Sequence, residues 1–72
     1  MTGTTKLPLP AIRAIMGWTQ DDMAEKLGVS RSLVANWERG AAEMRPVYVH
    51  ALCGLTGISE SSILLPEKST KR

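Results

Sequence analysis

The stretch from Trp18 to Gly40 constrains the fold of this chain more than any other feature of the sequence. It divides at Gly28 into two short segments whose apolar residues follow an i, i+1, i+4 spacing, which places them on one face of a helix. These residues are Met23, Ala24 and Leu27 in the first segment and Leu33, Val34 and Trp37 in the second. The pattern predicts two amphipathic helices joined by a tight turn.

Each of these helices begins at a residue suited to that position. Thr19 can cap the first helix, with Asp22 three residues later as its reciprocal partner, and Ser30 can cap the second. Asp21, Asp22 and Glu25 place negative charge near the positive N-terminal end of the first helix. Local hydrogen bonding therefore supports the boundaries that the apolar spacing indicates.

The second helix has a polar face without acidic side chains. The residues outside its apolar stripe are Arg31, Ser32, Ala35, Asn36 and Arg39. A short helix that is held by its apolar side and offers hydrogen-bond donors on the other can enter the major groove of DNA.

This stretch resembles the helix-turn-helix of phage Cro and CI repressors and of the bacterial regulators called the XRE family. The matching residues are Thr19-Gln20 at the first helix, Leu27-Gly28-Val29-Ser30 at the turn, and Trp37-Glu38-Arg39-Gly40 at the end of the second helix. The similarity extends from about Ile12 to Leu65. It implies a compact, all-α, five-helix domain like that of lambda repressor. The second helix of the helix-turn-helix, which is helix three of the domain (about 30–39), is then expected in the DNA major groove.

The resemblance also implies roles for individual residues. Gln20 matches a glutamine that spans phosphate and base, and the alternative is an ordinary first-turn helix residue. Arg31 and Ser32 match the principal base-reading positions, and Asn36 matches another contacting position. Arg31 can present its guanidinium fork to guanine O6 and N7, or merely neutralise a phosphate.

Further DNA contacts are expected beside these residues. Ala35 can pack on a thymine methyl group, and the backbone N–H of Thr19 can anchor a phosphate. Arg39 and Arg45 can reach the DNA backbone beside the groove. In the family, an arginine matching Arg13 pairs with a glutamate matching Glu38, so we expect these two side chains to touch.

The remaining segments predict three more helices. The first runs from Pro10 to about Met16 and ends at Gly17, and its inner residues are Ile12, Ile15 and Met16. The fourth runs from Pro46 to about Thr56 and is stopped by Gly57, and its apolar stripe comprises Val47, Tyr48, Ala51, Leu52 and Leu55. Ser59 is expected to cap a fifth helix through Ile63, Leu64 and Leu65, ended by Pro66.

Length and composition limit the other possibilities. The 72 residues suffice for one domain, which we expect over residues 10–66, with a flexible arm at 1–9 and a disordered basic tail at 67–72. One cysteine, Cys53, allows no intramolecular disulfide, which fits a reducing compartment. Together with the lack of a long apolar run, this favours a cytoplasmic, nucleoid-associated protein with no membrane contact.

No enzymatic or metal-binding set is expected. The single histidine, His50, and Cys53 cannot close a metal site together, and no nucleophile–base pair or phosphate-binding loop is present. His50 is expected as a surface or half-buried residue of its helix and Cys53 as a small buried side chain. The sequence therefore predicts a protein that is not an enzyme and has no cofactor.

The charge distribution leaves two function classes open. The net charge is +2, but residues 10–65 carry five basic and six acidic side chains, and the 41–44 loop, which grips phosphate in related repressors, contains no cation. The leading interpretation is a sequence-specific repressor that binds a double-stranded operator as a homodimer, paired through Met44 to Pro46 and helix five. The alternative is a module that binds another regulator protein, such as an antirepressor, antitoxin or co-regulator, through an exposed patch of Met44 with Val47 or Tyr48.

Overall fold

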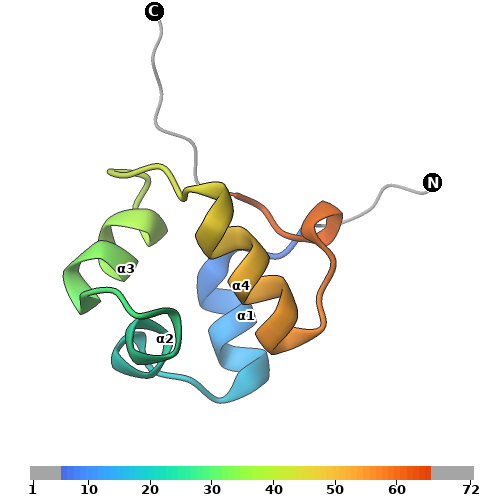
Figure 1. Cartoon of the computed structure of the whole chain (residues 1–72), viewed down its shortest axis with the longest axis horizontal. Helices are drawn as coiled ribbons and strands as arrows, with labels where there is room; N and C mark the ends of the chain where they lie inside the picture. The colour runs from blue at the N-terminus through green and yellow to red at the C-terminus, as the bar shows by residue number, and fades with distance from the viewer. Residues whose placement is uncertain (1–5, 66–72) are drawn as a thin grey trace, which may run out of the picture.

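The computed structural model describes residues 6–65, which form four α-helices and one short 3₁₀ helix. The helices are α1 (Leu9–Met16), α2 (Gln20–Leu27), α3 (Arg31–Glu38) and α4 (Pro46–Thr56), and the 3₁₀ helix is η1 (Glu60–Ser62). In Figure 1, α2 and α3 lie together on one side of α1 and α4, and η1 lies on the other. None of the helices in this part of the chain is long and apolar enough to cross a membrane.

The local hydrogen bonds at the start of α2 and α3 confirm the predicted caps. Thr19 Oγ1 accepts the Asp22 N–H and the Thr19 N–H donates to Asp22 Oδ2, both at 3.0 Å. Ser30 Oγ accepts the Leu33 N–H at 3.1 Å. Between the helices, Gly28 adopts φ +72°, a left-handed conformation that costs glycine little because it has no Cβ. The helix-turn-helix is therefore specified by interactions close in sequence.

The core draws buried residues from all four α-helices, together with Met44 before α4 and Ile63 after η1. Met23, Ala24 and Leu27 of α2 are buried, as are Val34 and Trp37 of α3, as their spacing predicts. Leu33 is only half-buried and packs at the edge of the core. The Trp37 ring meets the ring of Tyr48 from α4, with centroids 5.5 Å apart, so the aromatic side chains join α3 to α4.

The buried face of α1 differs from the predicted stripe. The helix begins one residue early, at Leu9, and its buried residues are Leu9 and Ile12, with Met16 half-buried. Ile15, which was expected inside, is 62% exposed. Leu9, Ile12 and Met16 follow the i, i+3, i+7 spacing of one face, and Ile15 lies beyond its edge.

The predicted stripe of α4 is right only in part, because Leu52 is buried and Tyr48 half-buried as predicted but the other members are not. Val49 and Leu52 are buried, whereas Ala51 is exposed, Val47 is 64% exposed and Leu55 is 44% exposed. Most residues of this helix are apolar, so periodicity alone does not define one face. Contacts with α2 and η1 select the buried side.

The predicted fifth α-helix is replaced by η1 and an extended segment. Leu7 and Ile63 form a parallel β-bridge, in which the Leu7 N–H donates to the Ser62 carbonyl and the Leu64 N–H to the Leu7 carbonyl, both at 2.8 Å. Ser59 does not cap a backbone N–H, because its hydroxyl faces those of Ser61 and Ser62. The bridge between Leu7 and Ile63 takes the backbone groups that an α-helix would use for its own hydrogen bonds.

The bridge also brings part of the expected N-terminal arm into the fold. Leu7 is half-buried and Ile63 is 1% exposed. The other parts of the predicted termini, residues 1–5 of the arm and the 67–72 tail, lie outside the described residues.

Paired substitutions in α1 test which of its isoleucines belongs to the core. Ile12→Val should lower the free energy of unfolding by about 0.5–1.5 kcal/mol because it removes a buried methylene group. Ile15→Val removes the same group from an exposed position and should change it by less than about 0.5 kcal/mol. Urea denaturation followed by tryptophan fluorescence measures both, and equal losses in the two variants would contradict the orientation of α1.

Candidate nucleic-acid interface

The burial of α3 on one side determines which of its residues face outward. Val34 is 0% exposed and Trp37 is 1% exposed, so the opposite side of the helix carries the polar residues. Arg31, Ser32 and Arg39 are exposed, and Ala35 and Asn36 are partly exposed. The predicted polar face is therefore accessible to a partner along the whole helix.

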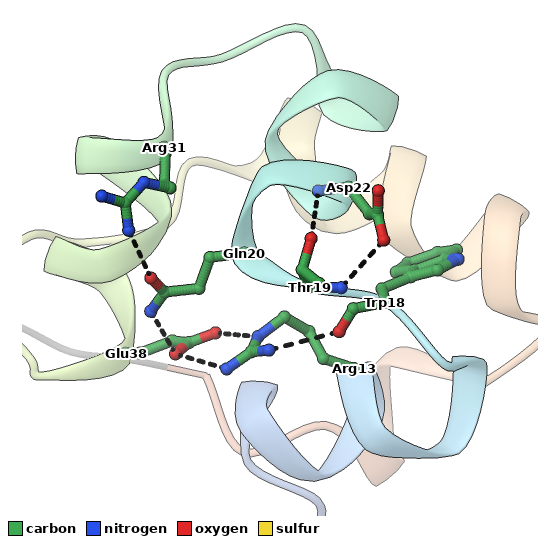
Figure 2. A network of polar contacts seen from close by, with 7 residues as sticks. All are labelled: Arg13, Trp18, Thr19, Gln20, Asp22, Arg31 and Glu38. Carbon is green, nitrogen blue, oxygen red and sulfur yellow. Dashed lines mark hydrogen bonds and ion pairs between the residues drawn. The ribbon is translucent and has the colours of Figure 1, made fainter.

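A part-buried ion pair holds α3 against α1. Arg13 Nε lies 2.6 Å from Glu38 Oε2, and Arg13 Nη2 donates to Glu38 Oε1 at 3.1 Å. The third contact of Arg13 runs from Nη1 to the carbonyl oxygen of Trp18, at 3.2 Å, in the link between α1 and α2 (Figure 2). The structure thus brings together the two residues that the resemblance pairs, and one guanidinium connects α1, the link between α1 and α2, and α3.

The surroundings of this pair favour the charged form of both side chains. Burial raises the pKa of Glu38, but the hydrogen bonds from Arg13 and Gln20 and the charge of Arg13 lower it by more, so the pKa lies below its ordinary value. The hydrogen bond to Glu38 and the charge of that carboxylate raise the pKa of Arg13 against the opposing effect of burial. Both groups are therefore ionised at neutral pH.

Gln20 links the ion pair to the start of α3. Its Nε2 donates to Glu38 Oε1 at 2.9 Å, and its Oε1 accepts from Arg31 Nη1 at 3.4 Å (Figure 2). A carboxylate can only accept hydrogen bonds, so Glu38 fixes which end of the Gln20 amide points inward. The amide oxygen consequently faces Arg31.

Two more polar contacts shape the outer face of α3. Asp21 Oδ1 lies 3.4 Å from Arg31 Nε, an ion pair between exposed side chains. Asn36 Oδ1 accepts from Arg39 Nε at 3.2 Å and from Nη2 at 2.6 Å. The amide oxygen of Asn36 is therefore occupied, and only its N–H donors remain for a base or phosphate unless Arg39 moves.

Two expected contributors are placed differently. The N–H of Thr19, expected as a phosphate anchor, instead donates to Asp22 Oδ2 within the capping box and is not available. Met44, expected in an exposed docking or pairing patch, is only 6% exposed. Its neighbours Arg45, which is the N-cap residue of α4, and Pro46 are exposed.

The residues considered for other chemistry stay apart. His50 is exposed on α4, as expected, whereas Cys53 is half-buried rather than fully buried. Among residues 6–65 no three His, Cys, Asp or Glu side chains gather in a way that could hold a metal ion. The polar face of α3 and the first turn of α2 carry the exposed polar network described above, so they form the candidate interface.

The sequence pattern did not reveal the role of Asp21 in this interface. Its position in the first turn of α2 indicated only a favourable interaction with the helix dipole. Contact with Arg31 depends on how closely the N-terminal ends of α2 and α3 approach, which local patterns do not report. The available signal was the opposite charge of two residues that each lie near the start of a helix.

Comparison with known families agrees with this geometry. The model of a family described as Helix-turn-helix matches residues 11–63, which is most of the chain. The matched range includes α2, the turn at Gly28 and α3, together with both residues of the Arg13–Glu38 ion pair. No curated protein sequence matches the chain at a significant level.

The Arg13–Glu38 pair should make stability depend on pH in the acid range. Because the pKa of Glu38 is lower in the folded chain than in the unfolded one, its stabilisation is complete above the unfolded pKa and is lost as the pH falls through the folded pKa. Glu38→Gln should cost about 1–3 kcal/mol at neutral pH and flatten this dependence. The measurement is urea denaturation between neutral pH and mild acid.

Glu25→Gln is the matched control, because it removes the same charge from an exposed position on α2. It should leave both the stability and its pH dependence nearly unchanged. If Glu38→Gln were as stable as the control at neutral pH, the ion pair would not stabilise the fold.

Proposed function

Because the chain belongs to the Cro/CI-type, or XRE, helix-turn-helix family of DNA-binding domains, we propose that it is a repressor that reads an operator through α3. The observation that carries this proposal is the orientation of α3. Val34 and Trp37 hold one side of the helix in the core, while Arg31 and Ser32 at its N-terminal end remain exposed. This is the end of a recognition helix that contacts base edges in the major groove.

The chemistry of the exposed face favours reading purines. Arg31 can donate two hydrogen bonds to guanine O6 and N7, the most discriminating contact a side chain offers. Asn36 lies farther along the same face and can reach an adenine edge once Arg39 releases its amide oxygen. Ser32 and Ala35 complete the surface, the latter as a contact for a thymine methyl group.

The supply of phosphate contacts is limited. Arg39 and Arg45 are exposed and can reach the DNA backbone on either side of the groove. The 41–44 loop between α3 and α4 contributes one acidic residue, Glu43, and no cation. Each phosphate contact contributes about 0.9 to the slope of log affinity against log salt, so we expect a shallow slope and weak binding to random DNA.

Dimerisation on the operator compensates for these few contacts. Two copies related by a two-fold axis place two recognition helices about one turn of DNA apart, ~34 Å. The surfaces available for pairing in the described residues include Arg45, Pro46 and Leu64, the last of which is 53% exposed. Such a homodimer reads a palindromic site twice and gains affinity from both halves.

Selection of bound sequences from a random duplex pool should therefore recover a two-fold symmetric site. Its half-sites should have centres about one helical turn, ~34 Å, apart, each containing a guanine for Arg31. Recovery of no preferred sequence would contradict operator reading. If the chain also bound another regulator protein, the alternative protein-interaction module would be favoured.

Substitutions on the polar face of α3 test base reading. Arg31→Ala and Asn36→Ala should each weaken binding to the selected duplex by about tenfold or more and relax its preference at one base pair. Lys26→Ala is the control for Arg31→Ala. It removes an equal charge from the last turn of α2, whereas Arg31 lies beside the first turn of that helix. Fluorescence anisotropy with labelled duplexes measures affinity, and unchanged affinity and preference in both α3 variants would eliminate reading by α3.

A further inference from the structure

The first turn of α2 contacts the guanidinium of Arg31 at two of its nitrogens. Asp21 Oδ1 lies 3.4 Å from Nε, and Gln20 Oε1 accepts from Nη1 at the same distance. Gln20 is itself fixed by Glu38, whose side chain is 9% exposed, so one of the two contacts is anchored in the part-buried network shown in Figure 2. Arg31 is consequently held toward α2 although it is exposed.

Asp21 suits the dipole of α2, as any acidic residue in its first turn would, but it is not part of the helix cap. The capping box that starts α2 uses Thr19 and Asp22, and Asp21 takes no part in it. A carboxylate beside a DNA-facing arginine opposes binding to a polyanion, because it repels phosphate and offsets the charge of the arginine. Among residues 6–65 only two ion pairs form, and this is the one at the DNA-facing edge.

The two contacts leave Arg31 able to read a base. A guanidinium has five N–H groups, of which Gln20 accepts one on Nη1, while the Asp21 carboxylate lies beside Nε as an ion pair without a directed hydrogen bond. The other three N–H groups belong to the two terminal nitrogens, so an end-on pair of hydrogen bonds to guanine O6 and N7 remains possible. Base reading therefore does not require Arg31 to leave α2.

Binding a phosphate with Arg31 has a different cost. A phosphate that Arg31 reaches only by swinging away from the first turn of α2 would break both contacts and leave the Asp21 carboxylate unpaired close to the DNA backbone. We propose that Asp21 is a specificity determinant, which holds Arg31 in its base-reading position and penalises its use as a sequence-independent phosphate contact. This inference rests on the proposed function and assigns a second residue to the same site.

The size of the effect follows from the exposure of the pair. The side chains of Arg31 and Asp21 are 63% and 78% exposed, so solvent screens their attraction. Exposed ion pairs of this kind change equilibria by a few-fold rather than by orders of magnitude. The proposal therefore concerns the ratio of affinities for two DNA sequences, not the ability to bind DNA.

The experiment compares two duplexes and two carboxylate variants. Asp21→Asn should bind a random duplex about threefold to fivefold more tightly than the wild type and gain less on the selected duplex, so that selectivity falls. Its salt slope on the random duplex should steepen by about 0.9, the value for one added phosphate contact. Glu25→Gln removes the same charge from the same helix and should leave selectivity and slope unchanged.

Combination with Arg31→Ala separates action through Arg31 from plain repulsion. If Asp21 acts through the arginine, the loss of selectivity caused by Asp21→Asn should disappear in the Arg31→Ala background. If the carboxylate only repels phosphate, the same gain in affinity should persist there. In addition, proton exchange of the Arg31 Nε–H, followed by NMR of the free protein, should accelerate in Asp21→Asn and not in Glu25→Gln.

The outcomes distinguish this inference from the function on which it rests. A wild-type chain that binds no duplex in a salt-dependent manner contradicts the proposed function. A wild-type chain that binds a selected duplex, with Asp21→Asn and Glu25→Gln indistinguishable in selectivity, contradicts the role of Asp21 alone. Persistence of the Asp21→Asn effect without Arg31 also overturns the inference.

Discussion

The burial of one side of α3 is the constraint on which the other features of this structure depend. Trp37 and Val34 are almost completely removed from solvent, and Trp37 packs against both the core and the Tyr48 ring. Burying a large aromatic side chain contributes more to folding than any exposed polar contact in the molecule. Since Arg31 and Ser32 lie on the opposite side of the same helix, the core determines what the helix can offer to DNA.

The polar network around Glu38 refines this arrangement. The carboxylate receives Arg13 from α1 and Gln20 from α2, so one side chain at the end of α3 connects three helices. The cost of removing these charges from water offsets much of their attraction, and the pair therefore fixes relative position more than it adds stability. The network also affects Arg31, because Glu38 orients the side-chain amide of Gln20, which accepts a hydrogen bond from this arginine.

Under the proposed function, the distribution of charge lets a small domain with few cations discriminate between DNA sequences. Weak attraction to the DNA backbone lowers binding to every sequence, and this disadvantage is greatest where no base contacts compensate. The Asp21–Arg31 contact and the cation-poor 41–44 loop act in the same direction. In the proposed operator complex, affinity comes chiefly from correct bases and from the pairing of two copies.

The sequence by itself determined the helix-turn-helix: the caps at Thr19 and Ser30, the bend at Gly28 and the inward side of α3 all depend on residues no more than a few positions apart. It also suggested the Arg13–Glu38 pair through family resemblance. Only the tertiary structure decided the buried side of α4, the pairing of Leu7 with Ile63, and the contacts that occupy the polar face. Those features depend on which distant segments meet, and a nearly all-apolar helix or an exposed charge is compatible with several neighbours until the core is assembled.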